Sequence, residues 1–401
     1  MREPLWTPPA DRVARSAMAQ FAAAAGHRVD STELHRWSVD RPEQFWAAAW
    51  RYLVPSVPLS GPALEGGGLL DTTWFPGLRF NVAERILAGD SDPGRVPGAD
   101  DVMFVAVDER GRRRVSTRGD AVAEVARVAA ALVDAGVQAG DRVAAWMPNT
   151  TESMLLMLGA ASLGAVVSSC SPDFGADGVL DRFGQIEPTV LVAADGYSYA
   201  GRPHDRRGEL ARIVEGLPSL RRLVVVPFLD DSPELGALAS ADGTPATAWS
   251  DWLAPYEGAT PSYVPLPFDH PWYVLFSSGT TGVPKCIVHR TGGVFLQHLK
   301  EQRLHLDIGP GDRVAYFTTC GWMMWNWLAT VPAAGATTVL YDGNPFHPRP
   351  QRLWDLAADE SLTFLGVSAR YLEAVEQTGY RPADAADLTS LRTLASTGSP
   401  L

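Results

Sequence analysis

Residues 277–285 read Ser-Ser-Gly-Thr-Thr-Gly-Val-Pro-Lys, and their side chains and backbone suit a phosphate group. Glycines have no Cβ, so the backbone at these positions can approach a polyanion closely and adopt positive φ. Successive backbone N–H groups can form an anion-binding nest. Four hydroxyl groups and one ammonium group add further hydrogen-bond donors. The sequence therefore predicts that a nucleotide triphosphate binds at Ser277, Ser278, Gly279, Thr280, Thr281, Gly282 and Lys285.

The spacing of this segment differs from that of the common P-loop. A P-loop has the pattern Gly-x4-Gly-Lys-Ser/Thr and continues directly into a helix. Here two residues separate Gly282 from Lys285, and the apolar runs at 272–276 and 286–289 predict strands on either side. A loop between two strands offers the phosphates no helix N-terminus. The alternative interpretation is an ordinary Gly/Thr hairpin turn on the surface.

Strand and helix patterns alternate from about residue 102 onward. Thr117 and Asp120 can cap a helix that ends at Gly136. Continuous apolar runs then predict buried strands, at 142–147, 190–193 and 223–226. Buried strands that alternate with helices are typical of an α/β protein whose parallel or mixed sheet is covered on both faces.

Local signals add three expectations. A helix is predicted to start near Asp40, because Asp40 and Glu43 form a capping-box pair and Pro42 suits the first turn. The apolar run at 154–167 is shorter than the roughly 20 residues that span a membrane, so we expect a buried helix followed by a buried strand. The Pro-, Gly- and Ser-rich stretch at 239–270 indicates a connection.

Composition excludes several classes of protein. The net charge of −12 argues against a nucleic-acid-binding surface, which needs a basic face. Cys170, Cys286 and Cys320 form no CxxC pair, so neither a zinc site nor a disulfide framework is predicted. No pattern typical of a secretion signal opens the sequence. We therefore expect a cytoplasmic enzyme without a membrane span, and the oligomeric state stays open.

The run at 275–289, Leu-Phe-Ser-Ser-Gly-Thr-Thr-Gly-Val-Pro-Lys-Cys-Ile-Val-His, resembles the phosphate-loop signature of the adenylate-forming superfamily. This superfamily comprises acyl-CoA synthetases, luciferases and the adenylation domains of peptide synthetases. Within it, the chain is most similar to acetoacetyl-CoA synthetases. Three further segments carry that resemblance: Trp-Phe-Pro-Gly-Leu-Arg-Phe-Asn at 74–81, Ser-Ser-Cys-Ser-Pro-Asp-Phe-Gly at 168–175 and Cys-Gly-Trp-Met-Met-Trp-Asn-Trp at 320–327.

The resemblance implies a ligase that works in two half-reactions. A carboxylate attacks the α-phosphate of ATP, releasing pyrophosphate and forming an acyl-adenylate, and the thiol of CoA then displaces AMP. ATP, Mg²⁺ and CoA are the implied cofactors, and acetoacetate is the implied acid, as in ketone-body and lipid metabolism. Positioning and charge stabilisation carry this kind of chemistry, so no protein nucleophile is expected.

The resemblance also implies further binding residues. Gly398, Ser399 and Pro400 match the segment that flanks the adenine ring. Arg202 matches a position that contacts the nucleotide phosphate of CoA, for which a bidentate guanidinium is suited. The alternative is that Arg202 is an ordinary solvated surface arginine.

The implied acyl pocket draws on Trp322, Met323 and Met324. These residues match the segment that lines the carboxylate site in short-chain synthetases, and Thr397 is placed at the same pocket. Because Met and Trp also fill gaps in protein interiors well, plain core packing is an equal alternative.

The resemblance divides the chain and places its end. We expect an N-terminal cap region at 1–100, a first α/β subdomain at 101–238, a connecting stretch at 239–270 and a second α/β subdomain at 271–401. Together they form the large N-terminal domain of the adenylate-forming fold, with layered β-sheets and helices on their faces. The fold is truncated before the C-terminal lid domain that carries the adenylation lysine.

The chain is therefore expected to be an N-terminal fragment that is inactive in isolation, with no assignable catalytic or metal-binding residue. Three alternatives stay open. The chain is a non-catalytic nucleotide-binding remnant, a ligase for acetate, propionate or another short-chain acid, or an enzyme that passes its acyl group to a carrier protein.

Overall fold

Two mixed β-sheets organise the computed structural model, which describes residues 7–68, 71–89, 91–92, 94–236, 238–278 and 282–399. The first sheet has seven strands in the order β12-β11-β8-β6-β7-β14-β15. All neighbours in it are parallel except the β14–β15 hairpin. Its strands are β6 (Arg142–Trp146), β7 (Val166–Cys170), β8 (Val190–Ala194), β11 (Arg222–Val226), β12 (Thr247–Ala248), β14 (Pro271–Phe276) and β15 (Cys286–Arg290).

The second sheet has six strands in the order β19-β18-β16-β17-β4-β5, and only the β4–β5 pair is antiparallel. The strands of this second sheet are β4 (Val102–Asp108), β5 (Arg113–Thr117), β16 (Arg313–Tyr316), β17 (Thr337–Asp342), β18 (Phe364–Ser368) and β19 (Thr393–Thr397). Each of the two sheets takes strands from both predicted subdomains, 101–238 and 271–401. The predicted boundaries between these subdomains stay a prediction.

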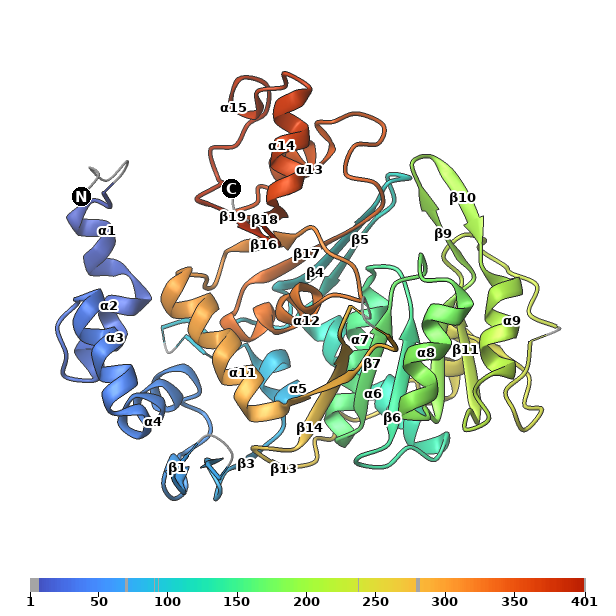
Figure 1. The fold of residues 1–401 in the computed structure, drawn as a ribbon, viewed down its shortest axis with the longest axis horizontal. Coiled ribbons are helices and arrows are strands. Elements are labelled where there is room, and N and C mark those ends of the chain that lie inside the picture. The colour runs from blue at the N-terminus through green and yellow to red at the C-terminus, as the bar shows by residue number, and fades with distance from the viewer. Residues whose placement is uncertain are drawn as a thin grey trace.

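Helices cover the outer face of each sheet and fill the space between the sheets (Figure 1). One hydrophobic cluster joins the seven-stranded sheet to α8 (Ala176–Ile186) and α9 (Arg207–Glu215). Another joins the six-stranded sheet to α13 (Arg352–Asp359) and α14 (Ala369–Gln377). The largest cluster lies between the sheets. This layering confirms the predicted α/β class.

The layer between the sheets is built around α6 (Arg118–Asp134) and α7 (Thr151–Leu163). The predicted cap is confirmed, because Thr117 and Asp120 form both bonds of a capping box, and Gly136 follows α6 with φ +81°. Helix α7 contacts α6, α5, β7 and β4, and almost every residue along it is buried. The predicted buried helix that runs into a buried strand is therefore confirmed. Also in this layer are α5 (Val82–Ala88), α11 (Thr291–Leu299) and α12 (Met323–Thr330).

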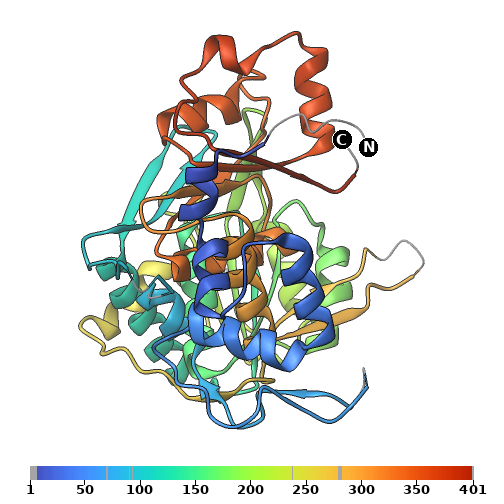
Figure 2. The same ribbon diagram turned by 90° about the vertical axis from the view of Figure 1, so that its left-hand side faces the viewer.

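Four helices precede the sheets and lie along one side of them (Figures 1 and 2). They are α1 (Ala10–Arg15), α2 (Ala17–Ala24), α3 (Ser31–Asp40) and α4 (Pro42–Leu53). The predicted capping role of Asp40 is wrong, because Asp40 is the last residue of α3. Helix α4 begins at Pro42 after Arg41, without a side-chain cap. The fixed φ of proline at the first helical position takes the place of the expected cap.

The remaining elements are short. None of the helices in the described part of the chain is long and apolar enough to cross a bilayer. The other helices are α10 (Trp249–Leu253), α15 (Pro382–Ala385), η1 (Ala254–Tyr256), η2 (Lys300–His305) and η3 (Val331–Ala334). The other strands form three two-stranded sheets, from β1 (Leu64–Glu65) and β2 (Thr73–Trp74), β3 (Arg79–Phe80) and β13 (Leu266–Pro267), and β9 (Gly196–Tyr199) and β10 (Arg202–Asp205).

We predict that Gly159→Ala destabilises the protein. Gly159 lies in α7 against α6, where an added Cβ would lie 2.9 Å from the Cβ of Val128. Val128 is β-branched and fully buried, so it has few other rotamers to adopt. We expect overpacking to cost about 1–3 kcal/mol of unfolding free energy, measured by urea denaturation.

Gly293→Ala in α11 is the matched control, because a Cβ there meets no atom within 4 Å. It should stabilise the protein by up to about 1 kcal/mol through helix propensity alone. Equal stabilisation by both substitutions would contradict the close packing of α6 against α7.

Candidate functional site

The predicted phosphate segment connects β14 to β15. The N–H of Ser277 donates to the carbonyl of Lys285 at 3.0 Å, and the N–H of Lys285 donates to Ser277 Oγ at 2.9 Å. Beyond this closed base, Ser278, Gly282 and Lys285 are exposed, and Gly282 has φ +146°, which favours glycine. Gly279, Thr280 and Thr281 lie outside the described residues. The segment thus joins two strands, as predicted, and no helix follows it directly.

The hairpin projects from the body of the fold (Figure 2). Strand β14 is parallel to β7, so the phosphate segment begins at the carboxyl edge of the seven-stranded sheet. Ligands of open α/β sheets bind at this edge. Lys285 forms no ion pair with any described residue, which leaves its charge available at the surface.

The predicted acyl segment lies at the same edge. Trp322 is the N-cap of α12 and Met323 its first residue. Their exposed fractions are 62% and 46%, so core packing does not account for either side chain. Met324 differs, because it is half-buried and packs against the central hydrophobic cluster. A large exposed indole and thioether side by side form a surface that can contact an apolar ligand group.

Hydrogen bonds fix the acyl segment to the carboxyl ends of β6 and β7. Ser169 Oγ donates to the carbonyl of Cys320 at 2.5 Å, and Cys320 Sγ donates to the carbonyl of Pro148 at 3.2 Å. Trp325 Nε1 donates to Asn149 Oδ1 at 3.1 Å. Since β7 is also the neighbour of β14, strand order brings the acyl segment and the phosphate segment to neighbouring positions.

The predicted adenine segment follows β19, at the carboxyl edge of the six-stranded sheet. Thr397 is the last residue of β19 and pairs with Ser368 of β18. Thr397, Gly398 and Ser399 are exposed, and Gly398 has φ +95°. Pro400 lies outside the described residues. Strand β16, which leads to the acyl segment, is separated from β19 by β18 alone.

Arg202 lies on a separate hairpin. It is exposed and is the first residue of β10, paired with Tyr199 of β9. The carboxylate of Glu109 accepts the N–H groups of Ala200 and Gly201, each at 3.0 Å, and that of Asn344 at 2.9 Å. Glu109 thereby joins the hairpin turn to the end of β17. Among the described residues, no hydrogen bond links this hairpin to the phosphate or acyl segments.

Sequence reasoning missed Asn149 and Asp342. Asn149 donates its backbone N–H to Asp342 Oδ1 at 2.9 Å and its side-chain amide to the carbonyl of Tyr341 at 3.2 Å. Asp342 is the last residue of β17 and Asn149 lies shortly after β6, so the available signal was a polar residue at the end of an apolar run. Burial, together with the charges of Asp108 and Glu109, raises the pKa of Asp342 to about 7.

Two of the three cysteines, Cys170 and Cys320, are buried. Burial raises the pKa of the Cys170 thiol to about 12 and raises that of Cys320 as well. All three cysteines are free. Within the described residues, no group of three His, Cys, Asp or Glu side chains could hold a metal ion.

Comparison with known proteins shows the family to which the chain belongs. Residues 96–401 match the family described as AMP-binding enzyme. The match covers well over half of the sequence, and the chain belongs to this family. Members of such a family use ATP.

Three relatives give the comparison its detail. Acetoacetyl-coenzyme A synthetase of Rhizobium meliloti (strain 1021) is 45% identical over 99% of this chain, and acetoacetyl-CoA synthetase of Mus musculus is 38% identical over 99%. The solved acetoacetyl-CoA synthetase from Streptomyces lividans superposes with a TM-score of 0.89 at 39% identity over 100% of this chain. These alignments cover 60%, 59% and 60% of the respective relatives, so the chain corresponds to about three fifths of their length, in their N-terminal part.

We predict that Asp342→Asn changes the pH dependence of stability. The folded-state pKa of Asp342 lies above its ordinary value, so the folded state binds more protons than the unfolded state between about pH 4 and pH 7. Asp342 therefore makes the protein less stable as pH rises through this window. The variant keeps an oxygen acceptor for Asn149 and loses this dependence. Its stability relative to the wild type should rise by at most about 1.4 kcal/mol per pH unit, then level off above pH 7.

Urea denaturation from pH 4.5 to pH 8 measures this difference. Asp359→Asn, at an exposed position in α13, is the control and should show no comparable pH-dependent gain. A constant difference between Asp342→Asn and the wild type across the range would show that the carboxyl group is not held in its protonated form.

Proposed function

We propose that this chain is the ATP- and acid-binding part of an ATP-dependent acid–thiol ligase that makes acetoacetyl-CoA. The overall reaction converts acetoacetate, ATP and CoA into acetoacetyl-CoA, AMP and diphosphate through an acyl-adenylate. The observation that carries the proposal is the common edge of the seven-stranded sheet. The phosphate segment follows β14 there, and Ser169 of the adjoining strand β7 holds Cys320, two residues before the exposed Trp322–Met323 pair. The names of the three relatives support acetoacetate as the acid.

In the proposed reaction the phosphate segment holds ATP. Ser277, Ser278, Gly279, Thr280, Thr281 and Gly282 offer backbone N–H and hydroxyl donors to the β- and γ-phosphates. Lys285 adds one positive charge, and Gly398, Ser399 and Pro400 flank the adenine ring. This arrangement keeps the α-phosphate in position for attack and stabilises the charge that develops on the leaving diphosphate.

Trp322, Met323, Met324 and Thr397 form the proposed acyl pocket. The acid's carboxylate supplies the nucleophile, so the protein's task is to exclude water and to align one oxygen with the α-phosphate. A polarisable, unbranched thioether suits a small keto acid because it adapts to irregular shapes. Arg202 is the proposed contact for a phosphate of CoA, and its exposed guanidinium is free to form a bidentate pair.

Magnesium enters this proposal as the Mg²⁺ complex of the substrate ATP. Mg²⁺ usually keeps several water ligands and is bound through substrate phosphates, so this proposal needs no dedicated cluster of protein ligands. We further propose that the enzyme acts in the cytoplasm, in lipid or ketone-body metabolism.

A different short-chain acid is the second candidate. Malonamoyl-CoA synthetase of Penicillium aethiopicum is 36% identical over 92% of this chain and is covered over 53% of its length. Its name shows that a relative of similar identity carries another acyl group. The acyl segment alone therefore does not select acetoacetate over acids of similar size, including acetate and propionate.

We predict that Lys285→Ala weakens Mg·ATP binding to the 401-residue chain. Removal of one charged hydrogen-bond donor from the triphosphate should cost roughly 1.5–3 kcal/mol of binding free energy. Isothermal titration calorimetry with a non-hydrolysable ATP analogue measures the change.

Arg290→Ala is the matched control, because it removes one exposed positive charge from the opposite end of β15. Its effect should be small. Equal losses in both variants would point to general electrostatic attraction, and unchanged affinity in Lys285→Ala would remove that lysine from the site.

We predict that the 401-residue chain alone releases no pyrophosphate from ATP. The same chain fused to the remaining two fifths of the Rhizobium meliloti relative should release it when acetoacetate is present. Acetate and propionate should support slower release. The reason for this expectation is that the chain corresponds to only about three fifths of the length of its acetoacetyl-CoA synthetase relatives.

Two results would contradict this assignment. Release by the chain alone would mean that these 401 residues suffice for adenylation. Equal or faster turnover with acetate in the fusion would exclude acetoacetate as the preferred acid, while leaving ATP use intact.

A further inference from the structure

The turn that precedes Arg202 has an unusual backbone conformation. Ala200 and Gly201 join β9 to β10, and Arg202 is paired with Tyr199 across the hairpin. The φ values of the two turn residues are +54° and +75°, and positive φ at both central residues is typical of a type I′ turn. Glycine adopts this conformation freely, but an alanine there is strained and persists only where other contacts hold it. The conformation of this turn fixes the direction in which β10 carries Arg202.

Glu109 supplies contacts that hold the turn. One carboxylate oxygen accepts the N–H of Gly201 at 3.0 Å, and the other accepts the N–H of Ala200 at 3.0 Å and that of Asn344 at 2.9 Å. Successive N–H groups of this kind form a nest for an anion, and charge-assisted hydrogen bonds are stronger than neutral ones. The charge of Glu109 is thus directed at the backbone of the turn, while Arg202 is exposed.

Two glycines allow this close approach. At Gly343, which has φ +134°, an added Cβ would lie 2.5 Å from the Cβ of Glu109. At Gly201, an added Cβ would lie 2.8 Å from Cε1 of His347. The tip of the hairpin therefore packs against the segment after β17 of the six-stranded sheet, although the hairpin itself follows β8 of the seven-stranded sheet. Figure 1 shows the hairpin beside the end of β5.

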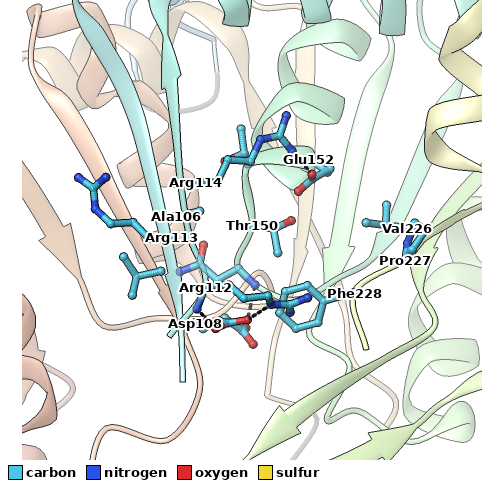
Figure 3. Close-up of a pocket in the computed structure, with 14 residues that line it drawn as sticks. Ala106, Asp108, Arg112, Arg113, Arg114, Thr150, Glu152, Val226, Pro227 and Phe228 are labelled. Atoms are coloured by element: carbon cyan, nitrogen blue, oxygen red, sulfur yellow. Dashed lines mark hydrogen bonds and ion pairs between the residues drawn. The ribbon is translucent and has the colours of Figure 1, made fainter. Parts of the chain in front are cut away.

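The loop between β4 and β5, which carries Glu109, is itself held in place (Figure 3). The carboxylate of Asp108 accepts the backbone N–H of Arg112 at 2.9 Å and its Nε–H at 2.6 Å. The Arg112 guanidinium also lies 4.6 Å from the centre of the Phe228 ring. Arg110 donates to the carbonyl of Phe228 at 3.3 Å. These contacts fasten the β4–β5 loop to the segment that follows β11.

The same segment after β11 holds the base of the hairpin. Asp195, directly before β9, accepts the N–H groups of Phe228 and Leu229, each at 2.8 Å. The contacts therefore form a closed ring, which runs from the hairpin base through this segment and the β4–β5 loop to Glu109 and the hairpin tip. A hairpin that is held at both ends presents its side chains from a fixed place, as precise recognition of a ligand requires.

We propose that Glu109 is the positioning residue for Arg202. Through the Ala200–Gly201 turn it keeps the backbone of Arg202 in one place, so that less conformational freedom is lost when a phosphate of CoA binds. This inference rests on the proposed function, because it takes Arg202 to contact that phosphate. Glu109 itself touches no substrate in this proposal.

Isothermal titration calorimetry of the 401-residue chain with CoA tests this role. Arg202→Ala should weaken CoA binding about tenfold, the usual effect of losing a charged hydrogen bond. Glu109→Gln keeps the shape of the side chain but replaces one accepting oxygen by an NH₂ group, and should weaken binding about threefold to tenfold. The double variant should bind CoA no more weakly than Arg202→Ala alone, because Glu109 acts only through that arginine. Binding of a non-hydrolysable Mg·ATP analogue should stay unchanged in Glu109→Gln.

Two further variants separate positioning from general stability. Asp30→Asn is the matched control, because Asp30 also accepts two backbone N–H groups, those of Thr32 and Glu33, each at 2.9 Å, at the start of α3. It should leave CoA affinity unchanged. Ala200→Asn gives the turn the Asn-Gly sequence that type I′ turns prefer. Added to Glu109→Gln, it should restore most of the lost CoA affinity.

Several results would overturn the proposal. A full further loss of affinity from Glu109→Gln in the Arg202→Ala background would mean that Glu109 acts independently of Arg202. Equal losses of CoA and ATP-analogue affinity, or no recovery with Ala200→Asn, would mean that the turn is not what Glu109 controls. Weaker CoA binding in Arg202→Ala with none in Glu109→Gln would exclude the positioning role alone. Absence of CoA binding at millimolar concentrations, or unchanged affinity in Arg202→Ala, would instead contradict the CoA contact of the proposed function and, with it, this role.

Discussion

The burial of α7 between two sheets is the constraint on which the rest of the structure depends. This helix presents apolar side chains in every direction, so it is stable in water only when both sheets cover it. Strands β7 and β4, one from each sheet, contact it directly. The distance between the two sheets is therefore set by the diameters of α7 and of the helices packed beside it. The carboxyl edges of the two sheets meet as a result.

The meeting of the two carboxyl edges brings together residues that are far apart in the chain. Asn149 follows β6 and forms hydrogen bonds both to Asp342, the last residue of β17, and to Trp325 of α12. Cys320 is held in the same way from Ser169 and Pro148. The acyl segment thus rests on a network of buried hydrogen bonds that spans both sheets, and its two exposed apolar side chains are presented on a rigid base.

The sequence predicted the elements better than the contacts between them. Continuous apolar runs located the central strands because such runs are compatible with few other structures, and the Thr117–Asp120 pattern located the start of α6. The capping prediction for Asp40 was wrong because a capping pattern uses only local sequence, whereas the residue at which α3 ends depends on how that helix packs. Asp342 stood out only as a polar residue at the end of an apolar run, and the uncapped start of α7 gave no signal, since the environment of both arises only when two sheets meet. Gly279, Thr280, Thr281 and Pro400 lie outside the described residues, so their predicted roles depend on the resemblance alone.

Strand β15 has a mechanical consequence for the phosphate segment. Hydrogen bonds tie β14 to β7 on its inner side, but β15 forms the edge of the sheet and exposes Ile287 and Val288. Few buried apolar contacts oppose an outward displacement of β15, whereas the root of β14 is held by the core. Lys285, directly before β15, is therefore held by fewer buried contacts than Ser277, directly after β14.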